Sequence, residues 1–401
     1  MATLYLHIGT PKTGTSAIQK FLPLNKELLE EQGYCYPDFG YRYPGIGVNR
    51  NAHFMVYRYK KTLCESDEEL EAKRKEEDER FFEGLDKIKE LSETFPNIIL
   101  SDENIWNGYG KRNDFWNVLK SALTERGIDL KVIVYLRRQD LVLESYWSQQ
   151  VRETLQIDFQ EYVDSEEYSF FKLGYYKRIS NIAEIVGKEN IIVRAYEKQQ
   201  YEGNGNTLIS DFLKVLGLEL DERYESADIV VNSSLHGRYL EVKRILNRID
   251  CFSTKLNWAV KYLKAAQDEY ENANGSLKCE YFTYEQRINF LEKYENGNSA
   301  IAKEYMNRED GILFRDEIKK NDAADENYSA DELVLICGKM LEFQNEDMKL
   351  KLEEMNNKLN DMSVRLENTK RSLEYAKRPF IRRFAGKIFY SIFKNKKAEK
   401  E

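Results

Sequence analysis

The first 24 residues constrain the fold of this chain more than any other stretch. Apolar residues alternate with others from Leu4 to Ile8, a turn with Gly and Pro follows, and apolar residues then recur at helical spacing from Ala17 to Leu22. This pattern predicts a strand, a loop and a helix. Such a loop gathers backbone N–H groups at the positive end of the helix dipole, so we expect it to bind an anion such as a phosphate.

The loop departs from the nucleotide-binding P-loop at one position. The P-loop has the form GxxxxGK[ST]. Gly9 and Gly14 have this spacing, but Thr15 stands where the lysine is expected, and the lysine lies inside the loop as Lys12. A nucleotide triphosphatase with this loop would lack the lysine contact to its outer phosphates.

A second segment carries a matching feature. The apolar strand from Lys131 to Leu136 ends at Arg137, and the helix that follows places Ser145 eight positions after this arginine. Together with the first loop, this spacing resembles the sulfotransferases that use 3′-phosphoadenosine 5′-phosphosulfate (PAPS). In that family an Arg and a Ser at this spacing bind the 3′-phosphate of PAPS. The resemblance, to bacterial carbohydrate sulfotransferases in particular, extends from residue 2 to about residue 320.

The resemblance implies which residues of the loop and of the second segment bind PAPS. Lys12 would neutralise the oxygen that bridges sulfur to the leaving 5′-phosphate, while Arg137 and Ser145 hold the 3′-phosphate. PAPS is then the co-substrate, and no metal is required because the lysine and the helix terminus already offset the charge. The residues that this resemblance assigns to the 5′-phosphosulfate are Pro11, Lys12, Thr13, Gly14, Thr15 and Ser16.

The acceptor hydroxyl or amine needs a general base, and the sequence offers two. His53 lies in an irregular loop rich in Gly, Pro and Asn, and imidazole is the side chain that changes charge near neutral pH. Glu103 follows the short apolar strand at 97–101, and ligands of parallel sheets bind where strands end. His7, on the first strand, is expected in the core. The choice between His53 and Glu103 stays open here.

Strands that alternate with helices predict an α/β fold with a central parallel sheet. We expect a P-loop-type three-layer sandwich with helical cap insertions and a C-terminal coiled-coil helix. The expected sulfotransferase domain covers residues 1–335. Within it, the mostly helical, tyrosine-bearing segment 235–305 is the candidate cap that binds the acceptor.

Apolar residues near the C-terminus repeat at alternating spacings of four and three, which is the seam of a coiled coil. Residues 336–377 are therefore expected to self-associate into a homo-oligomer. The alternative is a long helix that packs back on its own domain. The seam residues are Leu341, Asn345, Met348, Leu352, Met355, Leu359, Met362, Leu366, Thr369, Leu373 and Ala376.

The last segment, 378–401, combines a basic face with an apolar face. In a chain whose formal net charge is −8, such a terminus is typical of a helix that lies on an anionic membrane surface. The alternative is a terminal helix docked on the domain with its basic side in water. We expect a cytoplasmic protein that is peripheral on the inner face of the membrane.

Composition excludes several classes. The net charge of −8 argues against a general nucleic-acid binder. The five cysteines are odd in number and scattered, which favours a reduced protein over a disulfide framework or a zinc site. The sequence begins directly with a strand pattern rather than a secretory signal, and it has no apolar run of about 20 residues.

These patterns favour transfer of a sulfuryl group from PAPS to a glycan or a lipid-linked saccharide. One alternative is a P-loop kinase that uses ATP and Mg²⁺, in which Asp102, after an apolar strand, would hold the metal. A second alternative is a catalytically inactive, membrane-associated coiled-coil scaffold. The missing P-loop lysine counts against the kinase, and the presence of Lys12, Arg137 and Ser145 together counts against the scaffold.

Overall fold

A computed structural model shows an α/β protein with a central five-stranded sheet in which every strand pair is parallel. The strand order is β2-β3-β1-β4-β5. The α/β fold class expected from the sequence is confirmed. The structure describes residues 2–47, 49–108, 114–166, 172–225, 235–253, 258–275, 279–318, 320, 328–377 and 385–390.

The middle of the sheet is buried on both faces, so β3 and the second half of β4 are nearly continuous runs of buried residues, whereas β5 alternates between buried and partly buried residues. At its centre, Leu6 of β1 pairs with Leu100 of β3 on one side and with Val132 of β4 on the other. All three side chains are fully buried. The strands are β1 (Ala2–His7), β2 (Tyr34–Cys35), β3 (Asn97–Ser101), β4 (Ile128–Leu136) and β5 (Ile191–Ala195).

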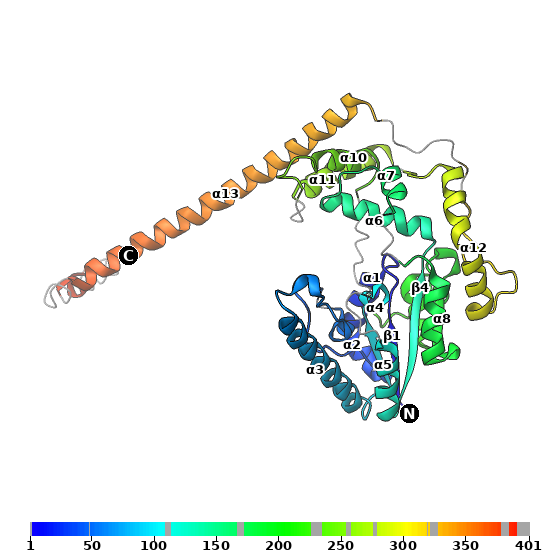
Figure 1. Cartoon of the computed structure of the whole chain (residues 1–401). Coiled ribbons are helices and arrows are strands. Elements are labelled where there is room, and N and C mark those ends of the chain that lie inside the picture. The colour runs from blue at the N-terminus through cyan, green and yellow to red at the C-terminus, as the bar shows by residue number, and fades with distance from the viewer. Residues whose placement is uncertain are drawn as a thin grey trace.

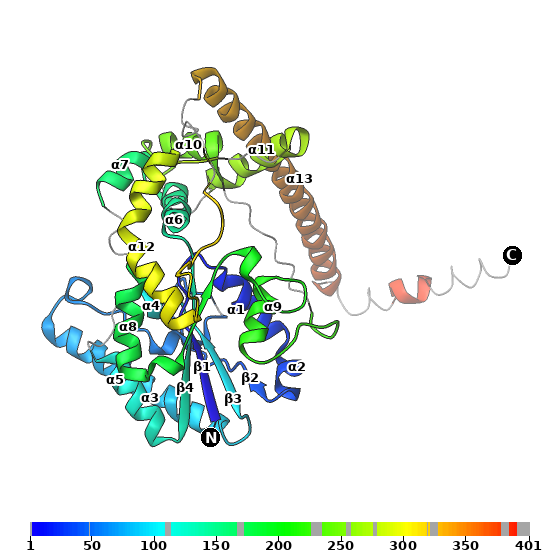
Figure 2. The same cartoon turned by 90° about the vertical axis from the view of Figure 1, so that its right-hand side faces the viewer.

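Helices cover both faces of the sheet and complete three layers (Figure 2). Buried residues of α1, α2 and α9 form a core with one face, and buried residues of α3, α5 and α8 form a larger core with the other. These helices are α1 (Thr15–Leu24), α2 (Lys26–Glu31), α3 (Asp67–Leu91), α5 (Phe115–Glu125), α8 (Tyr175–Val186) and α9 (Leu208–Val215).

A helical cap lies beyond the carboxyl ends of the strands (Figure 1). It has a third hydrophobic core, separate from the two cores of the sheet. Three of its helices, α10 to α12, fall in or overlap the segment predicted to be helical. The cap helices are α6 (Gln139–Glu153), α7 (Phe159–Asp164), α10 (Gly237–Leu246), α11 (Trp258–Asn274) and α12 (Tyr284–Met306).

Short elements complete the connections between these layers. They are the short helix α4 (Asn104–Asn107) and the 3₁₀ turns η1 (Asn51–Met55), η2 (Lys61–Leu63), η4 (Lys188–Asn190) and η5 (Lys198–Gln200).

A buried lysine fixes the end of α6. The side chain of Lys243, on α10, is fully buried, and its Nζ donates to the carbonyls of Val151 at 3.5 Å and Glu153 at 3.3 Å. It also donates to the side chain of Asn247 and to the carbonyl of Phe252. The last carbonyls of a helix lack intrahelical partners, and a cation there also complements the helix dipole. Lys243 therefore anchors the C-terminal turn of α6 within the cap.

A network of buried charges joins the start of α6 to α12. Arg287 on α12 is bound to Asp140, to Glu144 at 2.9 Å and to Glu280, and Arg138 donates to Asp140 at 2.8 Å. Three carboxylates thus share one guanidinium on α12. Burial raises the pKa of Glu144 to about 7, which the Arg287 charge opposes and the neighbouring carboxylates reinforce.

This pKa predicts a stability that depends on pH. The pKa of Glu144 is higher in the folded protein than its ordinary value, so protonated Glu144 stabilises the folded state. This stabilisation is fully present below about pH 4.5 and is lost as the pH rises through 7. Replacing Glu144 by Gln is expected to raise the free energy of unfolding at pH 8 by about 1–3 kcal/mol, and by less at pH 5. Urea unfolding at both pH values measures this difference.

Glu280→Gln is the matched control, because the Glu280 side chain is 41% exposed while it contacts the same arginine. We expect that substitution to change stability by less than about 0.5 kcal/mol at either pH. Equal stability of Glu144→Gln and the wild type at pH 8 would contradict the assignment.

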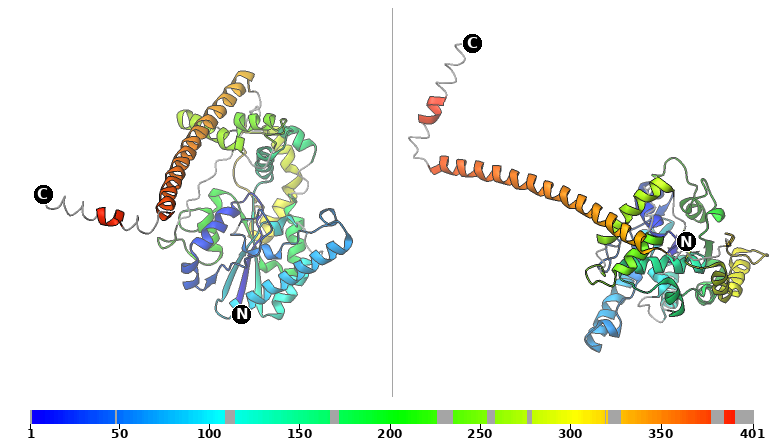
Figure 3. Two further views of the ribbon diagram at one scale, coloured as in Figure 1. Left: turned by 90° about the vertical axis from the view of Figure 1, so that its left-hand side faces the viewer. Right: turned by 90° about the horizontal axis from the view of Figure 1, so that it is seen from above.

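The C-terminal helix α13 (Ala330–Lys377) has 48 residues. Its first turns pack against α10 and α11, and the remainder leaves the body of the protein (Figure 3). The predicted coiled coil, 336–377, falls entirely within this helix, and its self-association stays a prediction. Of the predicted basic tail, 378–401, residues 385–390 are helical, and the other residues lie outside the described part of the chain.

Candidate active site

The candidate site lies at the edge of the sheet where β1, β3, β4 and β5 end. Backbone hydrogen bonds tie the loop after β1 to the last residues of β4: Tyr135 N–H donates to the Gly9 carbonyl at 2.7 Å, and Thr10 N–H donates to the Tyr135 carbonyl at 2.9 Å. The Tyr196 N–H, after β5, donates to the Leu136 carbonyl at 2.7 Å. The parallel topology therefore brings together segments that are far apart in the sequence.

The loop between β1 and α1 has the conformation of an anion-binding nest. Lys12 and Gly14 have φ values of 70° and 71°, in the left-handed region, and α1 begins directly after Gly14. In the described part of the chain, no backbone N–H group from Lys12 to Ser16 donates to a backbone carbonyl. Successive N–H groups in such turns converge on a concave, electropositive site.

Gly14 is required here by close packing as well as by its φ. A Cβ atom at this position would lie 2.4 Å from Leu208 Cδ2 and 3.2 Å from the Tyr196 ring. Thr13, which is fully buried, donates its hydroxyl to the Thr10 carbonyl and so fixes the turn from inside. Thr15 is buried at the start of α1, whereas Ser16 is exposed.

The side chain of Lys12 extends from the loop to the cap helix α6. Its Nζ donates to the side-chain oxygen of Gln149 on α6. Burial lowers the pKa of Lys12 to about 8, and the charges of Arg152 and Arg137 act in the same direction. Crowding of three cations is unfavourable by itself and would be relieved by a bound anion.

The structure places Arg137 beside this loop. One guanidinium nitrogen donates to the Lys12 carbonyl at 3.1 Å, and the guanidinium lies 5.7 Å from the centre of the Tyr196 ring. Ser145 is half-buried on α6. Arg138, the neighbouring arginine, instead binds Asp140 and the Asp316 carbonyl, away from the loop.

Glu103 lies on the other side of the loop. A Cβ atom built on Gly9 would be 3.0 Å from Glu103 Cβ, so the glutamate backbone and the loop are in close contact. The Glu103 carboxylate accepts from Gln19 Nε2 at 3.1 Å and pairs with Arg50 at 3.2 Å. Its side chain is 19% exposed, and its charge acts on Lys12. The carboxylate is therefore held in place while part of it stays accessible.

His53 lies behind this carboxylate rather than beside the loop. Its Nδ1 is 2.7 Å from Asp102 Oδ2, and its side chain is 1% exposed. The other ring nitrogen, Nε2, is buried and has no hydrogen-bond partner among the described residues. The ring also packs edge-on against Tyr43. In the described residues, His53 is joined to the site through Asp102 and through Arg50, whose carbonyl accepts from the His53 N–H at 3.3 Å.

Asp102 is a fully buried carboxylate with both oxygens engaged. Arg50 binds it through two nitrogens, with the Nε to Oδ2 contact at 3.1 Å, and the Asn104 N–H donates to Oδ1 at 2.8 Å. Burial alone would raise the pKa of Asp102, but the bonds from His53 and Arg50 outweigh it and the pKa lies below its ordinary value. Asp102 therefore remains ionised and holds His53 and Arg50 in position.

The other two histidines are outside the site. His7 is fully buried in β1, its Nδ1 lies 2.9 Å from Ser101 Oγ, and burial lowers its pKa to about 3. His7 is therefore neutral and part of the core, as the sequence predicted. His236 directly precedes α10 in the helical cap, and its Nε2 lies 2.9 Å from the Glu271 carboxylate.

Sequence reasoning missed four side chains at this site: Gln19, Arg50, Gln149 and Arg152. The spacing of two of them could have indicated their position. Gln149 and Arg152 follow Ser145 by four and seven residues, so they lie on the same face of the helix as Ser145. Nothing in the sequence pattern pointed to Gln19 or Arg50.

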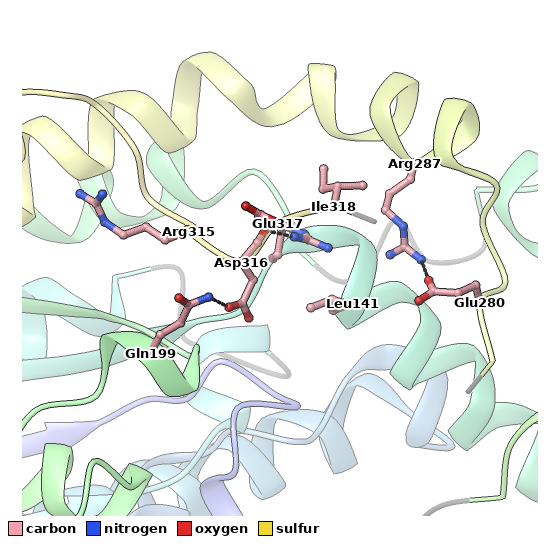
Figure 4. A pocket seen from close by; sticks show the side chains of 9 residues that line it. Leu141, Gln199, Glu280, Arg287, Arg315, Asp316, Glu317 and Ile318 are labelled. Carbon is pink, nitrogen blue, oxygen red and sulfur yellow. Dashed lines mark hydrogen bonds and ion pairs between the residues drawn. The ribbon is translucent and has the colours of Figure 1, made fainter. Parts of the chain in front are cut away.

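A cavity of about 550 Å³ opens next to Arg138, between α6, α12 and the segment around Asp316 (Figure 4). It contains three arginines, but each is paired with a carboxylate: Arg138 with Asp140, Arg287 with Glu280 and Arg315 with Asp310. Among the described residues that line this cavity, each arginine therefore has a carboxylate partner.

No family model matches the chain. It is 34% identical over 165 residues to an uncharacterized protein of Archaeoglobus fulgidus, a match that covers 41% of this chain and 42% of that protein. The chain thus spans less than half the length of this relative.

One solved structure, a sulfotransferase from Alicyclobacillus acidocaldarius, is similar over 61% of this chain and 95% of that one, with 14% identity and a TM-score of 0.34. In the described residues, no helix is long and apolar enough to cross a membrane, and no group of three or more His, Cys, Asp or Glu side chains is arranged to hold a metal ion.

Proposed function

We propose that the chain is a sulfotransferase that moves the sulfuryl group of PAPS to a hydroxyl or amine of an acceptor. The observation that carries this proposal is the meeting of Lys12 and Arg137 at the start of α1, where Arg137 donates to the Lys12 carbonyl. A loop of free N–H groups with one cation inside it and a second beside it fits a ligand that bears two separate phosphates.

Each group of the loop has a role in this proposal. The N–H groups and hydroxyls of residues 11–16 would hold the 5′-phosphate, and Lys12 would offset the charge that develops on the bridging oxygen as the bond to sulfur breaks. Arg137 and Ser145 would hold the 3′-phosphate and thereby select PAPS over ATP. Such a reaction requires little covalent chemistry from the protein, because positioning and charge stabilisation dominate, as in phosphoryl transfer.

The geometry favours Glu103 over His53 as the general base. The carboxylate of Glu103 lies beside the loop and is partly accessible, whereas His53 is buried behind Asp102. Arg50, which contacts both Asp102 and Glu103, positions the base in this arrangement. His53 then supports Asp102 and Arg50 rather than contacting the acceptor.

The kinase alternative requires an aspartate that is free to hold Mg²⁺. Asp102 is the residue at that position, but its two oxygens are bound by Arg50, His53 and a backbone N–H group. The charge arrangement therefore supports PAPS over a complex of ATP and magnesium. A catalytically inactive scaffold would have no use for the cations gathered at Lys12.

The acceptor remains a prediction from the sequence. A glycan or a lipid-linked saccharide suits the proposed reaction, and the cap beyond the sheet edge, including segment 235–305, is where it would bind (Figure 1). Residence in the cytoplasm and attachment of the tail to an anionic membrane are likewise predictions.

Calorimetric titration with adenosine 3′,5′-bisphosphate tests the proposal. We expect binding that is unchanged by EDTA, and we expect Arg137→Ala to weaken it roughly ten- to a hundredfold while binding of AMP stays the same. Arg223→Ala is the matched control, because Arg223 is an exposed arginine paired with Asp221.

Two results would contradict the proposal. Binding of ATP that depends on magnesium and ignores the 3′-phosphate would favour the kinase. Absence of nucleotide binding would favour the scaffold.

A further inference from the structure

Helix α13 has two apolar faces, and the described part of the chain covers one of them. The covered face includes Ile336 and Met340, which are buried against α10 and α11. Asp347, on the same side of the helix, accepts from Lys261 at 2.9 Å and from the hydroxyl of Tyr262. These contacts fix which side of α13 faces the body of the protein.

The second apolar face is the heptad seam, which points away from this docked side. Its large apolar side chains are each between 50% and 67% exposed, although they lie on a single face of one helix. A row of exposed apolar side chains of this length is typical of an interaction surface. They are Leu341, Met348, Leu352, Met355, Leu359, Met362, Leu366 and Leu373.

The period of the seam indicates another helix rather than a flat surface. Apolar residues recur every 3.5 residues, so on a straight helix the seam turns by about 20° per heptad. Over five heptads the rotation is about 100°. A partner helix can follow this rotation by supercoiling, whereas a planar bilayer cannot.

The residues that flank the seam are cationic. With Asn345 and the leucines from 352 to 373 in the a position, the flanking e and g positions from 344 to 377 contain no acidic residue. The acidic residues of this stretch lie on the other positions of the helix. The basic flanking residues are Lys349, Lys351, Lys358, Arg365, Lys370 and Lys377.

A second copy of this chain is a poor match for these flanks. In a parallel pair, Arg365 of one helix would face Lys370 of the other, and no flanking position would supply a carboxylate. An antiparallel pair brings the same cationic flanks together. Charges at these positions decide partner choice in coiled coils, since like charges that face one another are unfavourable.

We propose that the seam of α13 binds an α-helix of another polypeptide, one with apolar residues at its own a and d positions and acidic residues at e and g. The inference rests on the burial and charge of α13 alone, and it holds whether or not the chain is a sulfotransferase. Self-association, expected from the heptads, and membrane binding are then competing outcomes.

Two synthetic five-heptad peptides test the proposal with the full-length protein. Both have Leu at a and d, and one has Glu at e and g where the other has Lys. Fluorescence anisotropy is expected to show that the acidic peptide binds at least tenfold more tightly near physiological salt, and that high salt narrows the difference. Light scattering of the protein alone is expected to show a monomer at the same concentration.

A quadruple variant, Lys349→Glu, Lys358→Glu, Arg365→Glu and Lys370→Glu, is expected to reverse the preference between the peptides. It leaves Lys351 intact, because Lys351 pairs with Asp347 at 2.8 Å and Asp347 docks α13 on the body. The thermal unfolding of the body serves as the control for folding.

Three outcomes would overturn the proposal. The first is equal affinity for both peptides. The second is a dimer of the protein that an excess of the acidic peptide does not dissociate. The third is displacement of the acidic peptide by vesicles of phosphatidylcholine and phosphatidylserine, which would assign the seam to a membrane.

Discussion

Replacing Lys12 by alanine is expected to slow sulfuryl transfer by roughly a hundred- to a thousandfold, the loss typical when one charge-stabilising donor is removed from a transition state. Lys12 is the only lysine within the loop at residues 8–16, and its Nζ lies between the loop and Gln149 of α6. With a pKa of about 8 it is charged at neutral pH, so the wild-type protein holds this cation ready before the ligand binds.

Release of adenosine 3′,5′-bisphosphate from PAPS measures the effect, with water or an extracted surface glycan as the acceptor. Lys20→Ala is the matched control, because Lys20 is an exposed lysine on the same helix that follows the loop. A Lys12→Ala variant that retains more than a tenth of the wild-type rate would show that Lys12 does not stabilise the leaving phosphate.

Glu103→Gln is expected to lower the transfer rate by roughly a hundred- to ten-thousandfold, which is the usual contribution of a general base. Binding of adenosine 3′,5′-bisphosphate should stay within about threefold of the wild type, since glutamine is isosteric and can still accept from Gln19 and Arg50. Rate and binding therefore separate a base from a residue that holds the nucleotide.

His53→Asn provides the comparison, because it shortens a side chain that contacts Asp102 but not the loop. We expect it to lower the thermal stability and to slow transfer by less than about tenfold, because the Asp102 carboxylate loses a buried partner while Glu103 remains. A rate loss in His53→Asn as large as that in Glu103→Gln would assign the base to His53 instead.

Much of the framework could be predicted from sequence because it depends on local patterns. The strand, loop and helix around Lys12 follow from the spacing of apolar residues, glycines and hydroxyls along one continuous segment. Parallel strands then force their carboxyl ends together, which is why Arg137 and Glu103 were expected at the same edge as the loop. The structure shows this juxtaposition through the contacts of Arg137 with Lys12 and of Glu103 with the loop.

Contacts that depend on how elements pack could not be predicted in this way. Arg50 meets Asp102 only because η1 lies against the end of β3, where Asn51 bonds the Ile99 carbonyl and the Ser101 N–H. Gln149 reaches Lys12 only because α6 has a fixed rotation, set by charge pairs at its start and by Lys243 at its end. The helical spacing of Gln149 from Ser145 predicts which face of α6 it shares, but the spacing does not predict that this face meets Lys12.

The charge-laced helix α3 illustrates the same limit. Its mixture of acidic and basic residues predicts a helix whose charged side chains lie in water, and most of them are exposed. Glu77, however, is fully buried, where it accepts from Tyr43 and from the Arg58 N–H at 2.6 Å. The sequence does not distinguish a buried glutamate from an exposed one, because the difference lies in the hydrogen-bond partners that the fold supplies.

The part of α13 that extends from the body has a defined length. From Met348 to Lys377 the helix extends away from the described part of the body, over a length of roughly 45 Å at 1.5 Å per residue. If a partner holds the far end of this helix, the helix acts as a spacer. The site at Lys12 is then kept at a distance from the attachment point and can move over a spherical shell centred on that point. Acceptor groups within that shell are reached repeatedly without release of the protein, while those directly at the attachment point are out of reach.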